Sequence, residues 1–433
     1  MINNSVRGYV ETISADRCEV SGWLVADEED PRVVLHLDGS PAVQGVVGPE
    51  RRDVSSKIGL TCRSFTVRCD SPLWPGALTS DSVRVVVGGA RIELARGLLN
   101  SETAIYARSL ERLREDNHGL VQGSCPPGPV EVSRVPLPVG SRSTDGSGAV
   151  GRDGHLFLIK GSNFLARRYR RPGSPAEDQR VEHEVDRWFQ LVKERDTRCM
   201  ESGARFLQLI VPEKSSSLDS GIPELAGVTV VLERLEKRLA HDPSYLSGLD
   251  VLGRGAAAGP SWARLDTHVS TAGALKLFTA LMERAALASV LPEIPLESTE
   301  LHSGDLSRRF FGTDVGEPDL VPRSLFLEHL GSGVDLVESS DPPAGENRWL
   351  GMHRVWRNEH APISQKVVVF GNSYFGDPTR SARLNWWFTR FFREHHFFWA
   401  SSVDHEYVRE VRPDVVIAQT VERFLGGVPE DLG

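Results

Sequence analysis

The chain has 433 residues, of which 40% are hydrophobic and 25% are charged, and its 59 acidic and 50 basic side chains leave a net charge of -9. This mild acidity argues against a nucleic-acid partner, because the neutralisation of phosphates requires a concentrated basic surface. No segment approaches the roughly 20 consecutive apolar residues of a membrane span. The first residues, MINNSVRGYV, lack the basic and apolar regions of a signal peptide, so we expect a cytoplasmic location.

The five cysteines are scattered and show no CxxC or Cys/His ligand spacing. This pattern predicts neither a disulfide framework nor a zinc site, and we expect no metal. The chain is also too long for one ordinary core, so two or three domains are expected. The residues interpreted as reduced thiols are Cys18, Cys62, Cys69, Cys125 and Cys199.

Residues 6 to 97 alternate polar and apolar side chains, in segments such as RCEVSGWLVA and SVRVVVGG, with no helical period of useful length. About seven short strands at this spacing predict a small all-β sandwich, which we assign to residues 1–98. Its turns resemble those of β-sandwich modules found beside glycan-acting enzymes. That resemblance implies a glycan-binding or docking role, and a spacer role remains an alternative.

Residues 99–150 are expected to join this domain to the rest of the chain. The segment ETAIYARSLERLRE, residues 102–115, places Ile105, Leu110 and Leu113 on one face and predicts a short helix. Residues 123–151 are so rich in Pro, Gly and Ser that they predict a linker or an extended strap.

Residues 151–433 alternate between helical and strand patterns, which predicts an α/β domain with a mostly parallel sheet. Ser270 or Thr271 is suited to cap the helix that follows it. The predicted helices cover 177–200, VLERLEKRLA and STAGALKLFTALMERAALASV. The predicted strands are RFLQLIV, GLDVL, KVVVF and PDVVIAQT.

Ser373 lies in KVVVFGNSYFG, where a buried strand ends and a helix is expected to begin. In open α/β sheets this carboxyl edge is where ligands bind. Backbone N–H groups in such a turn can face a developing oxyanion, so the position suits a nucleophile. A serine after a strand also commonly caps a helix or holds a turn, and that structural role is the alternative.

A serine nucleophile needs a base, and the base needs an orienting acid. Asp266 and His268 in RLDTHVSTAGA lie two residues apart on an expected loop ahead of a capped helix. Asp266 could accept a hydrogen bond from one imidazole nitrogen while the other nitrogen faces Ser373. The alternative is that Asp266 ends a strand and His268 is a surface loop residue.

Six motifs, GRDGHLFL, VPEK, RLDTHVSTAGA, SGDLSRRF, VVVFGNSYF and RPDVVIAQTVERFL, occur in this order along the chain. Over residues 151–425 the chain resembles the alginate O-acetyltransferase branch of the SGNH-hydrolase superfamily. The resemblance implies an SGNH-hydrolase-like three-layer domain with a mostly parallel sheet. It also implies that Ser373 is the nucleophile, His268 the general base and acid, and Asp266 the orienting carboxylate.

The chain departs from the family pattern near the expected nucleophile. Asn372 replaces the Asp of Gly-Asp-Ser and so keeps an acceptor oxygen but loses a charge, Tyr374 replaces the common Phe, and His155 stands where Trp is usual. Asp305 and the Glu422-Arg423 pair match family positions, and we expect scaffolding roles for them. The residues expected to bind substrate or stabilise an oxyanion are Asn372, Tyr374, Asn358, Arg357 and Lys214.

Each of these additional assignments has a structural alternative. Lys214 could instead form a salt bridge with Glu213, and Arg357 and Asn358 could belong to a solvated loop. The aromatic run NWWFTRFFREHHFFW suits an acyl-binding groove, but aromatics at helical spacing more often form a core. The adjacent His395 and His396 make a poor metal pair.

These residues predict a serine-dependent O-acyltransferase that transfers an acyl group, expected to be acetyl, through an acyl-serine to a sugar hydroxyl. Alternatives are an esterase or deacylase with the same residues, or a catalytically silent glycan-binding protein. We expect no bound cofactor and a co-substrate such as acetyl-CoA or an acyl carrier thioester. The expected partners are a carbohydrate or glycosylated small-molecule acceptor and, for a thioester donor, an acyl carrier protein. Family members are exported, so the cytoplasmic location expected for this chain is a departure.

Overall fold

A computed structural model describes residues 8–14, 19–25, 32–36, 43–68, 84–87, 92–93, 95–96, 130–131, 139–143, 145–160, 165–311, 315–342 and 349–433. The helix predicted over 102–115 and most of the predicted linker lie outside these ranges, as do three of the five cysteines. The other two, Cys62 and Cys199, are buried free thiols. Among the described helices, none combines the length and the apolar character that a membrane crossing requires.

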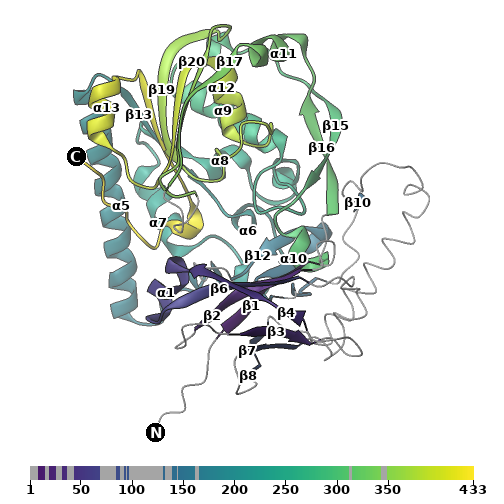
Figure 1. Ribbon diagram of the computed structural model, residues 1–433. Coiled ribbons are helices and arrows are strands. Elements are labelled where there is room, and N and C mark those ends of the chain that lie inside the picture. The colour runs from purple at the N-terminus through teal and green to yellow at the C-terminus, as the bar shows by residue number, and fades with distance from the viewer. Residues whose placement is uncertain are drawn as a thin grey trace.

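The N-terminal region consists mainly of antiparallel strands in two small sheets, with orders β5-β6-β2-β1-β9 and β4-β3-β7-β8 (Figure 1). The Tyr9 hydroxyl donates to the Asp145 carbonyl at 2.8 Å, which joins this region to the rest of the molecule. The strands are β1 Gly8–Ser14, β2 Glu19–Val25, β3 Val33–His36, β4 Val43–Gln44, β5 Val46–Glu50, β6 Cys62–Arg68, β7 Arg84–Val87, β8 Ile92–Glu93 and β9 Ala95–Arg96.

The expectation that no helix interrupts these strands is wrong, because α1, Arg52–Ile58, lies between β5 and β6. Asp53 lies in its first turn, where an acidic side chain stabilises the helix dipole. The helix ends at Gly59, whose φ of 73° is the left-handed conformation that favours glycine.

The centre of the molecule is a seven-stranded sheet of order β14-β13-β21-β19-β20-β18-β17. The strands from β14 to β20 pair in parallel, and β18 and β17 add antiparallel pairs at one edge. The predicted mixed α/β architecture with a mostly parallel sheet is therefore confirmed. The strands are β13 Arg205–Val211, β14 Tyr245–Ser247, β17 Val334–Ser340, β18 His353–Asn358, β19 Ile363–Gly371, β20 Phe392–Trp399 and β21 Val415–Val421.

Helices cover both faces of this sheet because successive strand side chains point to opposite sides (Figure 1). In β19, Val368 and Phe370 pack with α5, α7 and α13, whereas Val367 and Val369 pack with α9 and α12. The Ser270 hydroxyl caps α9 by accepting from the Gly273 N–H. The helices are α5 Pro175–Glu201, α7 Val230–Leu239, α9 Thr271–Arg284, α12 Leu384–Phe391 and α13 His405–Val411, and the first three confirm the predicted helices.

One predicted strand is wrong, and the aromatic run is a core segment. GLDVL is not a strand but α8, Gly248–Leu252, because the Ser247 hydroxyl accepts from the Asp250 N–H and starts a helix just after β14. The aromatic run from Asn385 onward forms α12 followed directly by β20, so its aromatic side chains serve a helix and then a strand of the core.

A separate three-stranded sheet of order β10-β16-β15 was not predicted. Its antiparallel hairpin consists of β15 Leu296–Ser303 and β16 Val315–Pro322, and β10 Val130–Glu131 pairs in parallel with β16. The register of the hairpin pairs His302 with Glu317 and Glu300 with Asp319. Because residues two apart in a strand share a face, these four side chains lie on one side of the hairpin.

Arg195 joins α5, the sheet and the C-terminal segment from a position that is 1% exposed. Its guanidinium donates to both carboxylate oxygens of Asp431, at 2.8 and 2.6 Å, and to Gln208 Oε1 at 3.0 Å. A buried ion pair that loses one partner leaves the other charge uncompensated.

We therefore expect Arg195→Met to lower the free energy of unfolding by about 3–5 kcal/mol. Urea unfolding followed by tryptophan fluorescence measures this change. Arg198→Met, which removes a surface pair with Glu194 on the same helix, should cost less than about 1 kcal/mol. Equal losses for the two variants would contradict the assignment.

Candidate active site

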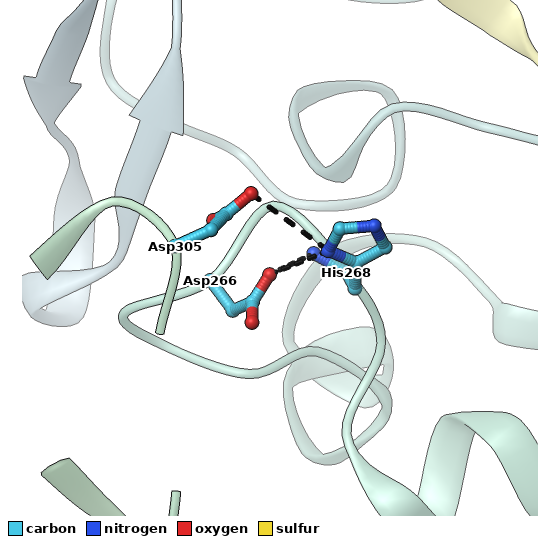
Figure 2. A group of neighbouring side chains, drawn as sticks. All are labelled: Asp266, His268 and Asp305. Carbon is cyan, nitrogen blue, oxygen red and sulfur yellow. Dashed lines mark hydrogen bonds and ion pairs between the residues drawn. The ribbon is translucent and has the colours of Figure 1, made fainter. Parts of the chain in front are cut away.

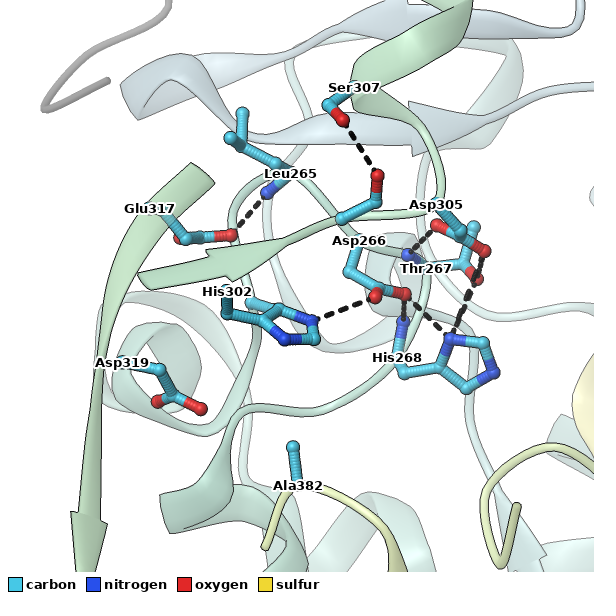
Figure 3. A network of polar contacts seen from close by, with 12 residues as sticks. Leu265, Asp266, Thr267, His268, His302, Asp305, Ser307, Glu317, Asp319 and Ala382 are labelled. Carbon is cyan, nitrogen blue, oxygen red and sulfur yellow. Dashed lines mark hydrogen bonds and ion pairs between the residues drawn. The ribbon is translucent and has the colours of Figure 1, made fainter. Parts of the chain in front are cut away.

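Asp266 and His268 lie on the loop that leads into α9, and buried charged groups hold this loop in place (Figure 3). The Glu317 carboxylate accepts from the N–H groups of Arg264 and Leu265 at 2.8 and 2.6 Å. The Lys214 ammonium donates to the carbonyls of Ala263 and Arg264 at 2.7 and 3.2 Å. The backbone of the loop is thus fixed from two sides.

Asp305 holds the same loop by accepting from the Thr267 N–H at 2.8 Å and from the Thr267 hydroxyl at 2.6 Å.

Lys214 hydrogen-bonds to the loop backbone and forms no salt bridge with Glu213, which instead pairs with Arg423 at 3.3 Å. Burial lowers the pKa of Lys214 to about 8, and the nearby Glu317 carboxylate offsets part of this decrease.

The structure brings Ser373, His268 and Asp266 into one hydrogen-bonded chain. Asp266 Oδ1 lies 2.6 Å from His268 Nδ1 and also accepts from the His268 backbone N–H at 2.9 Å. His268 Nε2 lies 2.7 Å from Ser373 Oγ. Because the carboxylate only accepts, Nδ1 carries the proton in this pair and Nε2 is free to accept from the serine hydroxyl.

The turn that presents Ser373 follows directly from β19. Asn372 shapes it, since its Oδ1 accepts from the Tyr374 N–H at 3.2 Å and its N–H donates to Gln419 Oε1 at 3.0 Å. The expectation that a helix begins here is wrong: one turn closes with the Phe375 N–H donating to the Asn372 carbonyl, and α12 begins only at Leu384.

Tyr374 packs against His268 and hydrogen-bonds to the loop that carries it. Its ring is buried with its centre 4.8 Å from that of His268, and its hydroxyl donates to the Thr267 carbonyl at 3.2 Å. The expected replacement of Phe by Tyr thus adds a hydrogen bond between the nucleophile turn and the Asp266–His268 loop. Burial raises the pKa of this phenol.

The structure does not bring Arg357 to this site. Arg357 pairs with Glu394 of β20, and Glu394 pairs with Lys366 of β19, five residues before Gly371. At about 3.3 Å per residue, roughly 17 Å of strand separates this end of the sheet from the edge that bears Ser373. The prediction that Arg357 binds substrate beside Ser373 is wrong.

Asn358 ends β18 at the same remote end and has a structural role. Its side-chain amide donates to the carbonyls of Leu330, Thr389 and Arg390, each at 3.0 Å. An amide used in this way has no donor for an oxyanion. The prediction of an oxyanion role for Asn358 is therefore wrong.

Two residues near Asp266 were not predicted. His302 Nε2 lies 3.0 Å from Asp266 Oδ2 (Figure 3). The Arg383 guanidinium lies 3.5 Å from the same oxygen. His302 directly precedes the SGDL motif, which is the only signal for it in the sequence. Arg383 lies in no recognisable motif. Its contact with Asp266 arises because the loop after Ser373 folds back toward that carboxylate.

These contacts set the charges of the dyad. Burial raises the pKa of Asp266, but His268, His302 and Arg383 together hold it well below its usual value, so the carboxylate is ionised. Burial lowers the pKa of His268, and Arg383 lowers it further, against the opposite effect of Asp266. His268 is accordingly a neutral base near neutral pH.

Asp266, His268 and Asp305 also offer ligand atoms within 4.8 Å of one another (Figure 2). A cation bound by all three would have to replace the Nδ1 proton that lies between His268 and Asp266. The short Nδ1 to Oδ1 distance of 2.6 Å instead favours the orienting role of the carboxylate.

Comparison with known proteins finds no matching family model and no matching curated protein. Among solved structures, the O-acetyltransferase domain of Pseudomonas putida AlgJ is similar at 18% identity and a TM-score of 0.38, over 66% of this chain and 94% of that chain. Bacillus cereus PatB1 is similar at 12% identity and a TM-score of 0.39, over 57% and 91% of the two chains.

A DHHW family protein from Eubacterium siraeum is similar at 14% identity and a TM-score of 0.41, over 65% of this chain and 92% of that chain. Similarity at this level does not identify an activity. The interpretation of the site therefore rests on its own geometry.

Replacing Arg383 tests the electrostatics of the dyad. A histidine acts as a base only above its pKa, and burial and Arg383 place the pKa of His268 below its ordinary value. The rate at which a fluorophosphonate labels Ser373 should therefore fall only as the pH drops below about 6.5. In Arg383→Gln this acid limb should move to higher pH, because a positive charge beside the ring is lost.

The control is Arg393→Gln, which changes an exposed arginine elsewhere in the sheet. Its acid limb should coincide with that of the wild type. An Arg383→Gln profile that stays in place or moves to lower pH would contradict the assigned electrostatics.

Proposed function

We propose that the chain is a serine-dependent O-acyltransferase that carries an acyl group, most simply acetyl, to a sugar hydroxyl through an acyl-serine. The observation that carries the proposal is the hydrogen-bonded chain from Asp266 through His268 to Ser373 Oγ. It supplies the nucleophile, base and orienting acid that acyl transfer requires. The ordered motifs of residues 151–425 favour transfer over hydrolysis.

In the first step His268 Nε2 takes the proton of Ser373 as Oγ attacks the carbonyl of an ester or thioester donor. The ionised Asp266 carboxylate holds the imidazole in place and stabilises its positive charge. The leaving alcohol or thiol takes the proton from Nε2 as its bond to the acyl carbon breaks, which leaves an acyl-serine.

The oxyanion formed in this step needs a donor at the turn. Among the residues that the structure describes, none accepts a hydrogen bond from the Ser373 backbone N–H, whereas the Tyr374 N–H is used by Asn372. The Ser373 N–H is therefore the donor that we assign to the oxyanion. Asn372 contributes by fixing the turn.

In the second step a sugar hydroxyl gives its proton to His268 Nε2 and attacks the acyl carbon. The bond to Oγ breaks, Oγ recovers the proton, and the acylated sugar leaves. Transfer prevails over hydrolysis to the extent that the acceptor is positioned and water is kept out.

The proposal also includes roles for the two regions of the chain, an acyl donor and a location. Residues 151–433 form the catalytic domain, with the SGNH-like three-layer arrangement, and residues 1–98 form a β-sandwich that binds glycan, docks or acts as a spacer. The donor is acetyl-CoA or an acyl carrier thioester, and no resident cofactor is needed. The cytoplasmic location remains a prediction.

An esterase or deacylase is the second candidate. Ser373 is partly exposed, so water as well as an alcohol can approach an acyl group on its hydroxyl. A hydrolase releases acid without an acceptor alcohol, whereas a transferase releases it slowly until a sugar is added.

Intact-protein mass spectrometry after treatment with a fluorophosphonate tests the role of Ser373. We expect one adduct on the wild-type protein and none on Ser373→Ala, and turnover of an acyl donor should fall by about 10⁴-fold or more in that variant. Ser401→Ala, which changes an exposed serine, is the matched control and should label fully. Equal labelling of wild type and Ser373→Ala would remove Ser373 from the mechanism.

A further inference from the structure

A polar pocket lies on the far side of Asp266 from Ser373. Its volume is about 220 Å³, below the roughly 300–1,000 Å³ of pockets for drug-sized ligands, so it suits a single small ring. Its lining comes from the β15–β16 hairpin, the start of α9, the loop after the Ser373 turn and the first turn of α12. Its polar and aromatic lining residues include Glu300, His302, Asp319, Thr379, Arg380 and Trp386.

His302 links this pocket to the proposed catalytic residues. Its side chain is 8% exposed, and its Nε2 bonds to Asp266 Oδ2. Because the carboxylate accepts, Nε2 carries a proton, and in the tautomer with its single proton there Nδ1 is an acceptor. Within the described part of the chain no residue hydrogen-bonds to this Nδ1, and His302 lines the pocket.

The rest of the pocket is also rich in acceptors. Glu300 and Asp319 are paired across the hairpin on the same face as His302, and Asp319 uses only its Oδ2 for contacts with Thr271. Thr379 and Arg380 supply donors, and the partly buried ring of Trp386 supplies an apolar wall.

Three acceptors, two donors and an aromatic wall match a ring that carries several hydroxyl groups. The Glu300 and Asp319 carboxylates lie beside the guanidinium groups of Arg380 and Arg323, the latter paired with Glu300 at 3.1 Å, so the lining has no excess positive charge to attract an anionic ligand. The geometry points to a subsite that binds a neutral sugar ring of the acyl acceptor, an inference that rests on the proposed function. Since three hydrogen bonds separate His302 from Ser373 Oγ, the bound ring is set back from the ring that is acylated.

The test measures binding without turnover, by isothermal titration calorimetry on the Ser373→Ala protein. The probes are four neutral disaccharides (cellobiose, maltose, lactose and diacetylchitobiose), with digalacturonate as the anionic comparator. We expect at least one neutral probe to bind and digalacturonate to bind more weakly. Adding Glu300→Gln should raise the dissociation constant of the bound probe roughly tenfold or more, because a hydrogen bond to a charged acceptor is lost.

Glu297→Gln is the matched control, because Glu297 lies on the same strand, is exposed and does not line the pocket. It should leave the dissociation constant unchanged. The subsite is refuted if no neutral probe binds, if binding survives Glu300→Gln, or if digalacturonate binds as tightly as the neutral probes.

Acetyl transfer from 4-nitrophenyl acetate to sugars by the wild-type protein tests whether the bound ring lies one position away from the ring that is acylated. The disaccharide that binds should be acetylated faster than the methyl glycoside of its single ring, and the reverse order would overturn this position. Failure of the proposed function is read separately, since fluorophosphonate labelling of Ser373 requires no sugar. Labelling without sugar binding refutes the subsite alone, and sugar binding without labelling refutes the acyl-serine mechanism.

Discussion

The ionised carboxylate of Asp266, which is 1% exposed, is the constraint on which the rest of the site depends. A buried charge is costly unless hydrogen bonds and opposite charges surround it. Asp266 accepts from the backbone and ring of His268, accepts from His302 and lies beside Arg383. These partners keep the carboxylate charged, and the carboxylate in turn fixes the His268 tautomer that leaves Nε2 facing Ser373.

This arrangement requires two segments that are far apart in the sequence to be held in a fixed position relative to each other. Ser373 follows β19 at the carboxyl edge of the parallel sheet, while the Asp266–His268 loop is held through its backbone by Lys214, Glu317 and Asp305. Tyr374 joins the two segments directly. A site held by rigid elements in this way keeps its reacting atoms within hydrogen-bond reach before substrate arrives.

Local patterns predicted the parts of the fold in which one periodicity dominates. The apolar runs of β13, β19 and β21 and the stripe of α5 could be assigned because nothing competes with their period. GLDVL was assigned wrongly because a serine cap outweighs a short apolar run, and the aromatic segment of α12 and β20 fits both periods. Residues 1–98 show the same limit, since α1 lies within a segment in which no helix was expected.

The candidate site divides in a similar way. Ser373, His268 and Asp266 could be proposed because each lies in a recognisable motif, and Asn372 and Tyr374 adjoin the first of these. Arg357 and Asn358 were included wrongly, because β18 carries them to the opposite end of the sheet. His302 and Arg383 were missed because their contacts with Asp266 arise only when the hairpin and the loop after Ser373 fold over it.

Proton NMR of protein labelled with ¹⁵N-histidine measures the Nδ1 proton between His268 and Asp266 most directly. The account predicts a strongly downfield proton bonded to nitrogen that is absent from His268→Gln, lost in Asp266→Ala and retained in Ser373→Ala. If no such signal exists, or if it persists without the carboxylate, then Asp266 does not orient His268 and the account of the site is contradicted.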